Sequence, residues 1–167
     1  MVIELLNPQT YHENLDSIFK LNQENIPEVG ELLSLQNLAQ LIGLSSFIYI
    51  SRFNDSIAGF IILMREGVDY KSENYKYFKS KYKRFLYIDR IVIDQDFRKK
   101  GIGSSFYNLA IQNAIENNLF LCCEVNQQPP NEVSMSFHKK FNFKEVGLGI
   151  QVKGKREVVY MEKSFEE

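Results

Sequence analysis

The sequence lacks most of the features that would place it outside the ordinary globular proteins. Its 167 residues include only two cysteines, Cys122 and Cys123. Adjacent residues alternate to opposite sides of a strand, so a disulfide framework is excluded and a thiolate metal site is disfavoured. No apolar run reaches the length of a membrane-spanning helix. The first residues lack the basic region and apolar run of a secretion signal, so none is expected.

An excess of charge of either sign is also missing. Lysine and arginine number 20 against 21 aspartate and glutamate residues, which gives a formal net charge of -1 and no global reason to expect nucleic-acid binding. There is no linker, internal repeat or low-complexity segment. The 44% hydrophobic and 25% charged fractions fit one globular domain spanning residues 1–167, and a cytoplasmic location is the default expectation.

Apolar periodicity predicts a mixed α/β order of elements rather than a regular alternation. Asn54-Asp55-Ser56 indicates a hairpin turn, and the KGK sequence at 153–155 indicates a second one. Predicted strands cover 2–5, 47–53, 57–65, 85–93, 119–125, 143–152 and 156–165. Predicted helices cover 11–26, 31–42, 131–141 and about 15 residues that begin near residue 101.

A basic turn with two glycines precedes the third of these helices along the chain. It reads Arg98-Lys99-Lys100-Gly101-Ile102-Gly103. The first turn of a helix presents unpaired N–H groups and the positive end of the helix dipole. Gly101 and Gly103 allow close approach of the backbone to phosphate oxygens and allow φ > 0. The turn therefore predicts a diphosphate site, and a plain solvated basic turn is the alternative.

This stretch resembles the signature of the GNAT acetyltransferase superfamily, an apolar strand followed by Arg/Gln-x-x-Gly-x-Gly/Ala and a helix. A second segment, NEVSMSFHKKFNFKEVG at 131–147, is similar to the family's Asn-x-x-(Ala/Ser)-x-x-Phe-Tyr-x-x-x-Gly-Phe-x-x-x-Gly segment. The order of elements agrees from residue 2 to 164, and FLYIDRIVI and CEVNQQPPN resemble a subgroup of predicted acetyltransferases. The resemblance implies an α/β fold with a mixed sheet of about seven strands, two of them splayed at its centre, and about four helices.

The resemblance also implies an acyl-CoA-dependent N-acyltransferase without a metal, with acetyl-CoA as co-substrate and direct attack by the amine in a ternary complex. The pantetheine arm would lie in the gap between the splayed strands. The acceptor would be a small-molecule or peptide amine, with no nucleic-acid or membrane partner, and a homodimer stays open. The implied cofactor-binding residues are Ile91, Val92 and Ile93 through their main chain, and Arg98, Lys99, Lys100, Gly101, Ile102, Gly103 and Ser104.

Three side chains are candidates for proton transfer. His138 takes the place of the family's Tyr, which protonates the departing thiolate; a cofactor contact and a surface position are its alternatives. Asp89, within an apolar strand, is the candidate base, and a structural ion pair is its alternative. Glu124 is the other candidate base. Asn131 either touches the cofactor or only caps its helix.

The insert at residues 67–87 does not identify the acceptor. Its aromatic and basic residues either border the acceptor pocket, anchor a solvated loop, or bind RNA. A non-catalytic acyl-CoA-binding module is the other functional alternative, because His138 replaces the expected tyrosine. A covalent cysteine intermediate is disfavoured, since buried thiols react poorly. The aromatic residues concerned are Tyr70, Tyr75, Tyr77, Phe78, Tyr82 and Tyr87.

Overall fold

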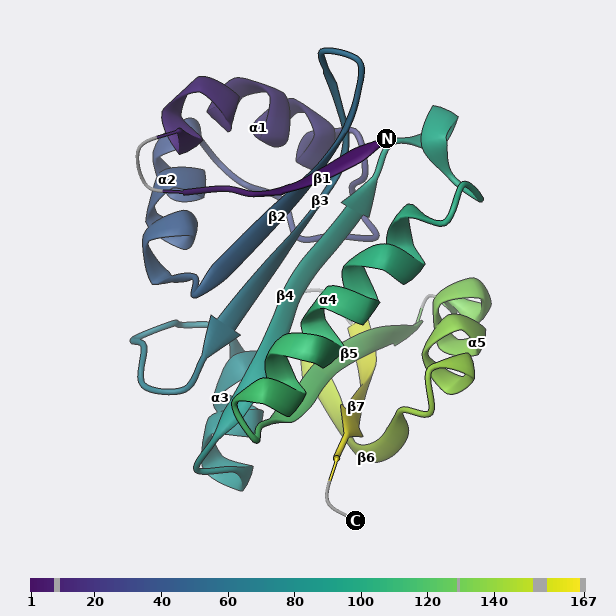
Figure 1. The fold of residues 1–167 in the computed structure, drawn as a ribbon. Helices are drawn as coiled ribbons and strands as arrows, with labels where there is room; N and C mark the ends of the chain where they lie inside the picture. The colour runs from purple at the N-terminus through teal and green to yellow at the C-terminus, as the bar shows by residue number, and fades with distance from the viewer. Residues whose placement is uncertain (8–9, 129, 152–155, 166–167) are drawn as a thin grey trace. The chain divides into compact units, whose positions relative to one another are not determined.

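The computed structural model describes residues 1–7, 10–128, 130–151 and 156–165. Seven strands form one sheet in the order β1-β2-β3-β4-β5-β7-β6, and these ranges hold five α-helices (Figure 1). The expected α/β fold with a mixed seven-stranded sheet is confirmed, with one helix more than expected. Contacts group the chain into two compact units, Met1–Met64 with Ile88–Ile111 and Arg65–Tyr87 with Gln112–Glu167. The single domain stays a prediction.

The first unit is built on an antiparallel meander. Strand β1 (Val2–Leu5) pairs with β2 (Phe47–Phe53), and β2 pairs with β3 (Ser56–Arg65). The predicted turn between β2 and β3 is present, with Asn54 at φ 55°, a conformation that asparagine tolerates better than most residues. Helices α1 (Leu15–Gln23) and α2 (Leu35–Leu44) contact each other (Figure 1). Their buried leucine and isoleucine side chains form part of this unit's core.

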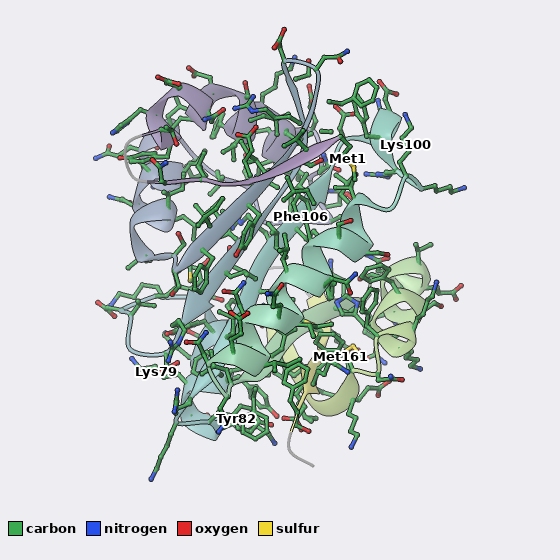
Figure 2. All side chains as sticks on the ribbon, viewed as in Figure 1. Met1, Lys79, Tyr82, Lys100, Phe106 and Met161 are labelled. Atoms are coloured by element: carbon green, nitrogen blue, oxygen red, sulfur yellow. The ribbon has the colours of Figure 1, made fainter. Side chains whose placement is uncertain are left out.

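Gly59 on β3 allows α4 (Ile102–Glu116) to begin close to the sheet. A Cβ at residue 59 would lie 2.8 Å from the main-chain oxygen of Val92 on β4 (Phe85–Ile93). It would also lie 3.3 Å from the Phe106 ring and 3.5 Å from Ile102. Both side chains are buried, and Figure 2 shows Phe106 on α4. The first turns of α4 are therefore fixed against β3 by close packing at a position that only glycine can occupy without displacement.

The second unit contains the start of β4, β5 (Phe120–Gln128), β6 (Lys144–Gln151) and β7 (Arg156–Lys163). The parallel ladder between β4 and β5 pairs Phe85, Leu86 and Tyr87 with Phe120, Leu121 and Cys122. Strand β7 is antiparallel to both β5 and β6. Helix α5 (Glu132–Lys140) follows β5, as the sequence predicted.

Helix α3 (Glu73–Lys81) is the element that the sequence did not predict. It lies within the polar insert and is capped by Ser72, whose side chain accepts a hydrogen bond from the Tyr75 N–H. Its side chains Tyr75 and Phe78 are fully buried. Only two or three residues of this short, lysine-rich segment face the core, so its sequence lacks a strong apolar period.

Other element boundaries differ by a few residues. The predicted helix over 11–26 is a 3-10 turn (Tyr11–Asn14) followed by α1, which ends at Gln23. The side chain of Gln23 accepts a hydrogen bond from the Leu32 N–H and so joins the end of α1 to the segment before α2. The helix expected at 31 begins after Ser34, whose side chain caps it. The predicted turn at 153–155 lies outside the described residues. Among the described helices, none is long and apolar enough to span a membrane.

Candidate functional site

The backbone between β4 and α4 has two residues in the left-handed region. Lys99 has φ 61° and Gly101 has φ 82°. A Cβ at Gly101 would meet no atom within 4 Å, so the backbone there is open rather than packed. Lys99 and Gly101 lie on either side of Lys100 and follow Arg98, which is extended with φ -63° and ψ 157°. Backbone turns can point neighbouring N–H groups to one side and form an anion-binding concavity. An anion site at this turn stays a prediction.

The N–H groups of this turn are available for a ligand. Within the described residues, the structure gives no hydrogen bond donated by the main-chain N–H groups of residues 99–104. The first turn of α4 is joined to the preceding chain by Ser105, which donates its N–H to the carbonyl of Gly101 at 3.0 Å. Donors at the start of a long helix add the favourable end of the helix dipole.

Two of the three basic side chains in the turn have protein partners. Arg98 donates through Nη2 to Asn25 Oδ1 at 2.8 Å and through Nε to the Ile93 oxygen at 3.4 Å. The Lys100 ammonium lies 4.8 Å from the centre of the Phe97 ring, a cation–π distance, and Figure 2 labels this side chain. These two side chains are therefore engaged within the protein, and a predicted anion site at the turn would depend on its backbone N–H groups.

Asp89 lies in the first unit and is held in an ion pair. Arg90 Nε donates to Asp89 Oδ2 at 2.8 Å, and the two side chains are 9% and 3% exposed. Arg90 Nη1 also donates to Asn22 Oδ1 at 2.8 Å and to the Gly30 oxygen at 3.2 Å. The pair belongs to a hydrogen-bonded network that joins β4 to the segment after α1. The ion pair foreseen as the alternative for Asp89 is present; a catalytic role stays a prediction.

The predicted pantetheine-binding residues lie in β4 of the first unit. Val92 is buried, whereas Ile91 and Ile93 are partly exposed. The N–H of Asp94, the next residue, donates to the Ala58 oxygen at 3.0 Å, so this end of β4 is joined to β3. Main-chain pairing of Ile91, Val92 and Ile93 with a ligand stays a prediction.

Glu124 lies in the second unit beside a buried tyrosine. The Tyr87 hydroxyl is 2.8 Å from Glu124 Oε2 and 3.0 Å from Oε1, and Glu124 itself is partly exposed. Tyr160 on β7 is the register partner of Glu124. The pKa of Tyr160 is raised, mainly by burial and also by the charge of Glu124. The carboxylate is therefore held by Tyr87 and belongs to a side chain that is not fully buried.

His138 is buried on α5. It is 4% exposed, so the surface position considered for it is wrong; its ring lies against Phe143 with centroids 5.4 Å apart. Nδ1 donates to the Ser134 oxygen at 2.6 Å, which fixes the ring orientation. Burial lowers the pKa of His138, although the hydrogen bond to Ser134 opposes this. The neutral form is thereby favoured, with its proton on Nδ1. Asn131 caps the same helix, accepting from the Ser134 N–H at 3.0 Å.

The buried histidine predicts a dependence of folding stability on pH. We expect wild-type protein to be less stable at about pH 5.5 than at about pH 7.5. Between the lowered pKa of folded His138 and its ordinary value of 6.5, the unfolded chain binds more protons. Stability is thus complete above that value and is lost as the pH falls. His138→Asn keeps a donor for the Ser134 oxygen but does not titrate, so urea unfolding should show a smaller pH dependence. An equal dependence in both proteins would contradict the assignment.

The aromatic side chains of the insert pack inside the second unit. Tyr77 stacks on Tyr160 with centroids 3.9 Å apart and an interplanar angle of 12°, and its hydroxyl donates to the Val146 oxygen. Gly147 leaves the space for this ring, because a Cβ there would lie 2.3 Å from the Tyr77 hydroxyl. Tyr75 and Phe78 are fully buried. The rings of Tyr75 and Phe78 are therefore covered by protein and offer no face on which an RNA base could stack.

The remaining candidates for reactive groups are the cysteine thiols and possible metal ligands. Burial raises the pKa of the Cys122 thiol, which disfavours a thiolate nucleophile, as expected for a buried cysteine. Across the described ranges, no three His, Cys, Asp or Glu side chains are grouped so that they could hold a metal ion.

A family model described as the acetyltransferase (GNAT) family matches residues 7–143. The chain belongs to this family. No curated protein sequence matches the chain. The match covers the predicted basic turn and residues 131–143 of the second segment on which the resemblance was based.

Solved GNAT structures share the fold over nearly the whole chain. The ribosomal-protein-S18-alanine N-acetyltransferase from Escherichia coli is 15% identical with a TM-score of 0.71, covering 98% of this chain and 92% of that one. The NatC complex bound to Gag peptide and CoA is 14% identical with a TM-score of 0.74, covering 99% of this chain and 98% of that one. An aminoglycoside 6'-N-acetyltransferase complexed with coenzyme A is 14% identical with a TM-score of 0.71, covering 98% of this chain and 97% of that one. At these identities the likeness shows the fold alone.

Proposed function

We propose that this GNAT protein transfers an acyl group, acetyl in the simplest case, from an acyl-CoA to an amine. The observation that carries the proposal is the turn at residues 98–104, where unpaired N–H groups and the left-handed Lys99 and Gly101 open α4. Such a turn suits a diphosphate. Two structures with the same fold were solved with CoA, which supports CoA as the source of that diphosphate.

The proposed reaction is direct transfer in a ternary complex. The acceptor's ammonium group gives a proton to a carboxylate, and its nitrogen lone pair then forms a bond to the thioester carbonyl carbon. The carbon–sulfur bond breaks, and the sulfur leaves as a thiolate that takes up one proton from the acid. The nitrogen, positively charged after the attack, gives up a second proton, which restores the acid and leaves a neutral amide. Positioning of the two substrates supplies much of the rate in such a reaction, so one base and one acid suffice.

Glu124 is the carboxylate that the geometry favours as the base. It is partly exposed, and its oxygens lie 2.8 and 3.0 Å from the hydroxyl of Tyr87. Asp89, the other candidate, is 3% exposed and bonded to Arg90, so its use as a base would require that pair to separate. His138 is the proposed acid for the thiolate. It must act as the imidazolium, which its lowered pKa makes less abundant near neutral pH.

The acceptor is proposed to be a small-molecule or peptide amine. Proteins with the same fold include one named for the alanine of a ribosomal protein, one bound to a peptide, and one named for aminoglycosides. Both classes present a primary amine that is protonated at neutral pH, which matches a site with a carboxylate base. The fold alone does not choose between them, so the test below includes both.

The proposal is tested by an amine panel with acetyl-CoA. We expect thiol release that depends on one class among polyamines, aminoglycosides, lysine derivatives and peptide N-termini, with the acetylated product seen by mass spectrometry. Calorimetry with coenzyme A, run in parallel, should show saturable binding. Thiol release that is the same with and without amine would contradict N-acyl transfer.

A non-catalytic acyl-CoA-binding protein is the second candidate. The observation that favours it is the buried His138, with its lowered pKa, in the position where the family signature has tyrosine. Tight coenzyme A binding without transfer to any amine of the panel would support this candidate. Absence of coenzyme A binding would exclude both candidates.

A further inference from the structure

Tyr87 and Glu124 form a contact between two parallel strands. Tyr87 on β4 is the register partner of Cys122 on β5, and Glu124 follows Cys122 on the same face of the sheet. The tyrosine is 1% exposed, and its hydroxyl lies 2.8 and 3.0 Å from the two carboxylate oxygens. One phenolic proton can serve either oxygen. The hydroxyl therefore holds the plane of the carboxylate without occupying all of its acceptor positions.

Helix α3 holds the Tyr87 ring. Tyr75 lies edge-on to it with centroids 5.7 Å apart, and Phe78 lies 5.9 Å away at 40°. Tyr75 is itself anchored, because its hydroxyl donates to the Arg65 oxygen at 2.8 Å. The ring of Tyr87 thus has little freedom to rotate away from Glu124. The unpredicted helix of the insert supplies this support.

Tyr160 is the other tyrosine beside Glu124, but its hydroxyl is directed elsewhere. It donates to Asn74 Oδ1 at 3.0 Å, and the contact is buried. The ring is stacked on Tyr77. The Tyr160 hydroxyl is thus bonded to Asn74, whereas the Tyr87 hydroxyl is bonded to the Glu124 carboxylate.

We propose that Tyr87 is a positioning residue for Glu124, and that the insert at residues 67–84 serves to hold it there through α3. The inference rests on the proposed function, in which Glu124 takes the proton of the acceptor ammonium. A carboxylate held by a buried donor keeps its lone pairs in a constant direction, and proton transfer depends steeply on such alignment. Outer contacts of this kind orient the group that reacts without touching the substrate.

A double-mutant cycle tests the inference. Tyr87→Phe removes only the hydroxyl and should lower kcat about tenfold, a part of the usual effect of a general base, while the KM for acetyl-CoA stays within about twofold. In the Glu124→Gln background the same change should have no further effect on kcat, because the residue it positions is gone. Independent, multiplicative losses in the double variant would overturn the inference.

Tyr82→Phe is the matched control. It also removes a phenolic hydroxyl that contacts a carboxylate in the second unit, but this carboxylate belongs to Glu162 and not to Glu124. We expect it to leave kcat unchanged even though it costs about 1 kcal/mol of stability through the lost hydrogen bond. Rates are normalised to the coenzyme A-binding fraction from calorimetry, so partial misfolding cannot imitate the effect. A loss of kcat equal to that of Tyr87→Phe would mean that general loosening of the second unit is responsible, which overturns the inference.

The outcome also separates this inference from the proposed function. A wild-type protein that acetylates none of the panel amines overturns both. A wild-type protein that acetylates an amine, combined with an unchanged kcat in Tyr87→Phe, overturns only the positioning role. A spermidine, aminoglycoside or peptide acceptor identified in the panel serves equally well for the cycle, since each is deprotonated before attack.

Discussion

Gly101→Val is expected to weaken coenzyme A binding by at least about 100-fold, because two charge-assisted hydrogen bonds from the turn, each worth about 1.5–3 kcal/mol, are lost. Gly101 has φ 82°, a conformation that a β-branched residue avoids. The backbone must change conformation to accept valine, so its N–H groups turn away from the diphosphate. Calorimetry with coenzyme A measures the loss directly.

Gly67→Val supplies the control for this experiment. Gly67 has φ 93°, and a Cβ there would also meet nothing within 4 Å. Both substitutions therefore cost about 1–2 kcal/mol of stability from the left-handed backbone, without a clash against neighbouring atoms. Only Gly101→Val should lose coenzyme A affinity. A Gly101 variant that binds as tightly as the wild type would refute the diphosphate assignment.

The turn was predictable because its chemistry is local. Glycines, cations and the start of a helix are adjacent in sequence, and the structure places α4 at Ile102 as the pattern indicated. The left-handed Lys99 was not foreseen, since lysine carries no preference for that conformation. The protein partners of Arg98 and Lys100 also required the structure, because Asn25 and Phe97 carry no signal that links them to the turn.

The contact between Tyr87 and Glu124 was not predictable from the sequence. In FLYIDRIVI the tyrosine is one apolar residue among several, and its hydroxyl acquires a partner only when a strand 35 residues later pairs in parallel with it. Helix α3 was missed for a related reason: its buried face consists of Tyr75 and Phe78, and their burial depends on the sheet beneath. Both the contact and the burial of α3 depend on tertiary pairing, which the local periodicity of the sequence does not encode.

The ion pair of Asp89 with Arg90 was also not predictable from the alternation of side chains along the strand. Neighbours in a strand point to opposite faces, so pairing between adjacent residues is not what alternation predicts. The contact forms because Arg90 bends toward Asn22 and Gly30, whose oxygens take its other donors. A carboxylate in an apolar strand was correctly recognised as needing a partner, but its identity depended on the segment after α1.

Glu124→Gln is expected to lower kcat about 10²- to 10³-fold at neutral pH, the range of a lost general base, while coenzyme A affinity stays unchanged. The amide keeps the size of the side chain and a hydrogen bond to Tyr87, but cannot take a proton from the acceptor. The deficit should shrink as the pH rises toward the pKa of the amine, about 10 for a lysine-like acceptor, because the neutral amine then exists without help. Steady-state rates between about pH 7 and 9.5 measure this change.

Two further variants decide whether that loss belongs to Glu124. Glu162→Gln is matched to it, since Glu162 lies opposite Cys122 on β7 and contacts the Tyr82 hydroxyl much as Glu124 contacts Tyr87. It should leave kcat unchanged. Asp89→Asn should instead unfold more easily, by about 3–5 kcal/mol, because it leaves the buried Arg90 charge without its carboxylate. If Glu124→Gln retains full activity at pH 7 and Asp89→Asn folds but does not turn over, the base is Asp89, and the ion pair with Arg90 is part of the catalytic site.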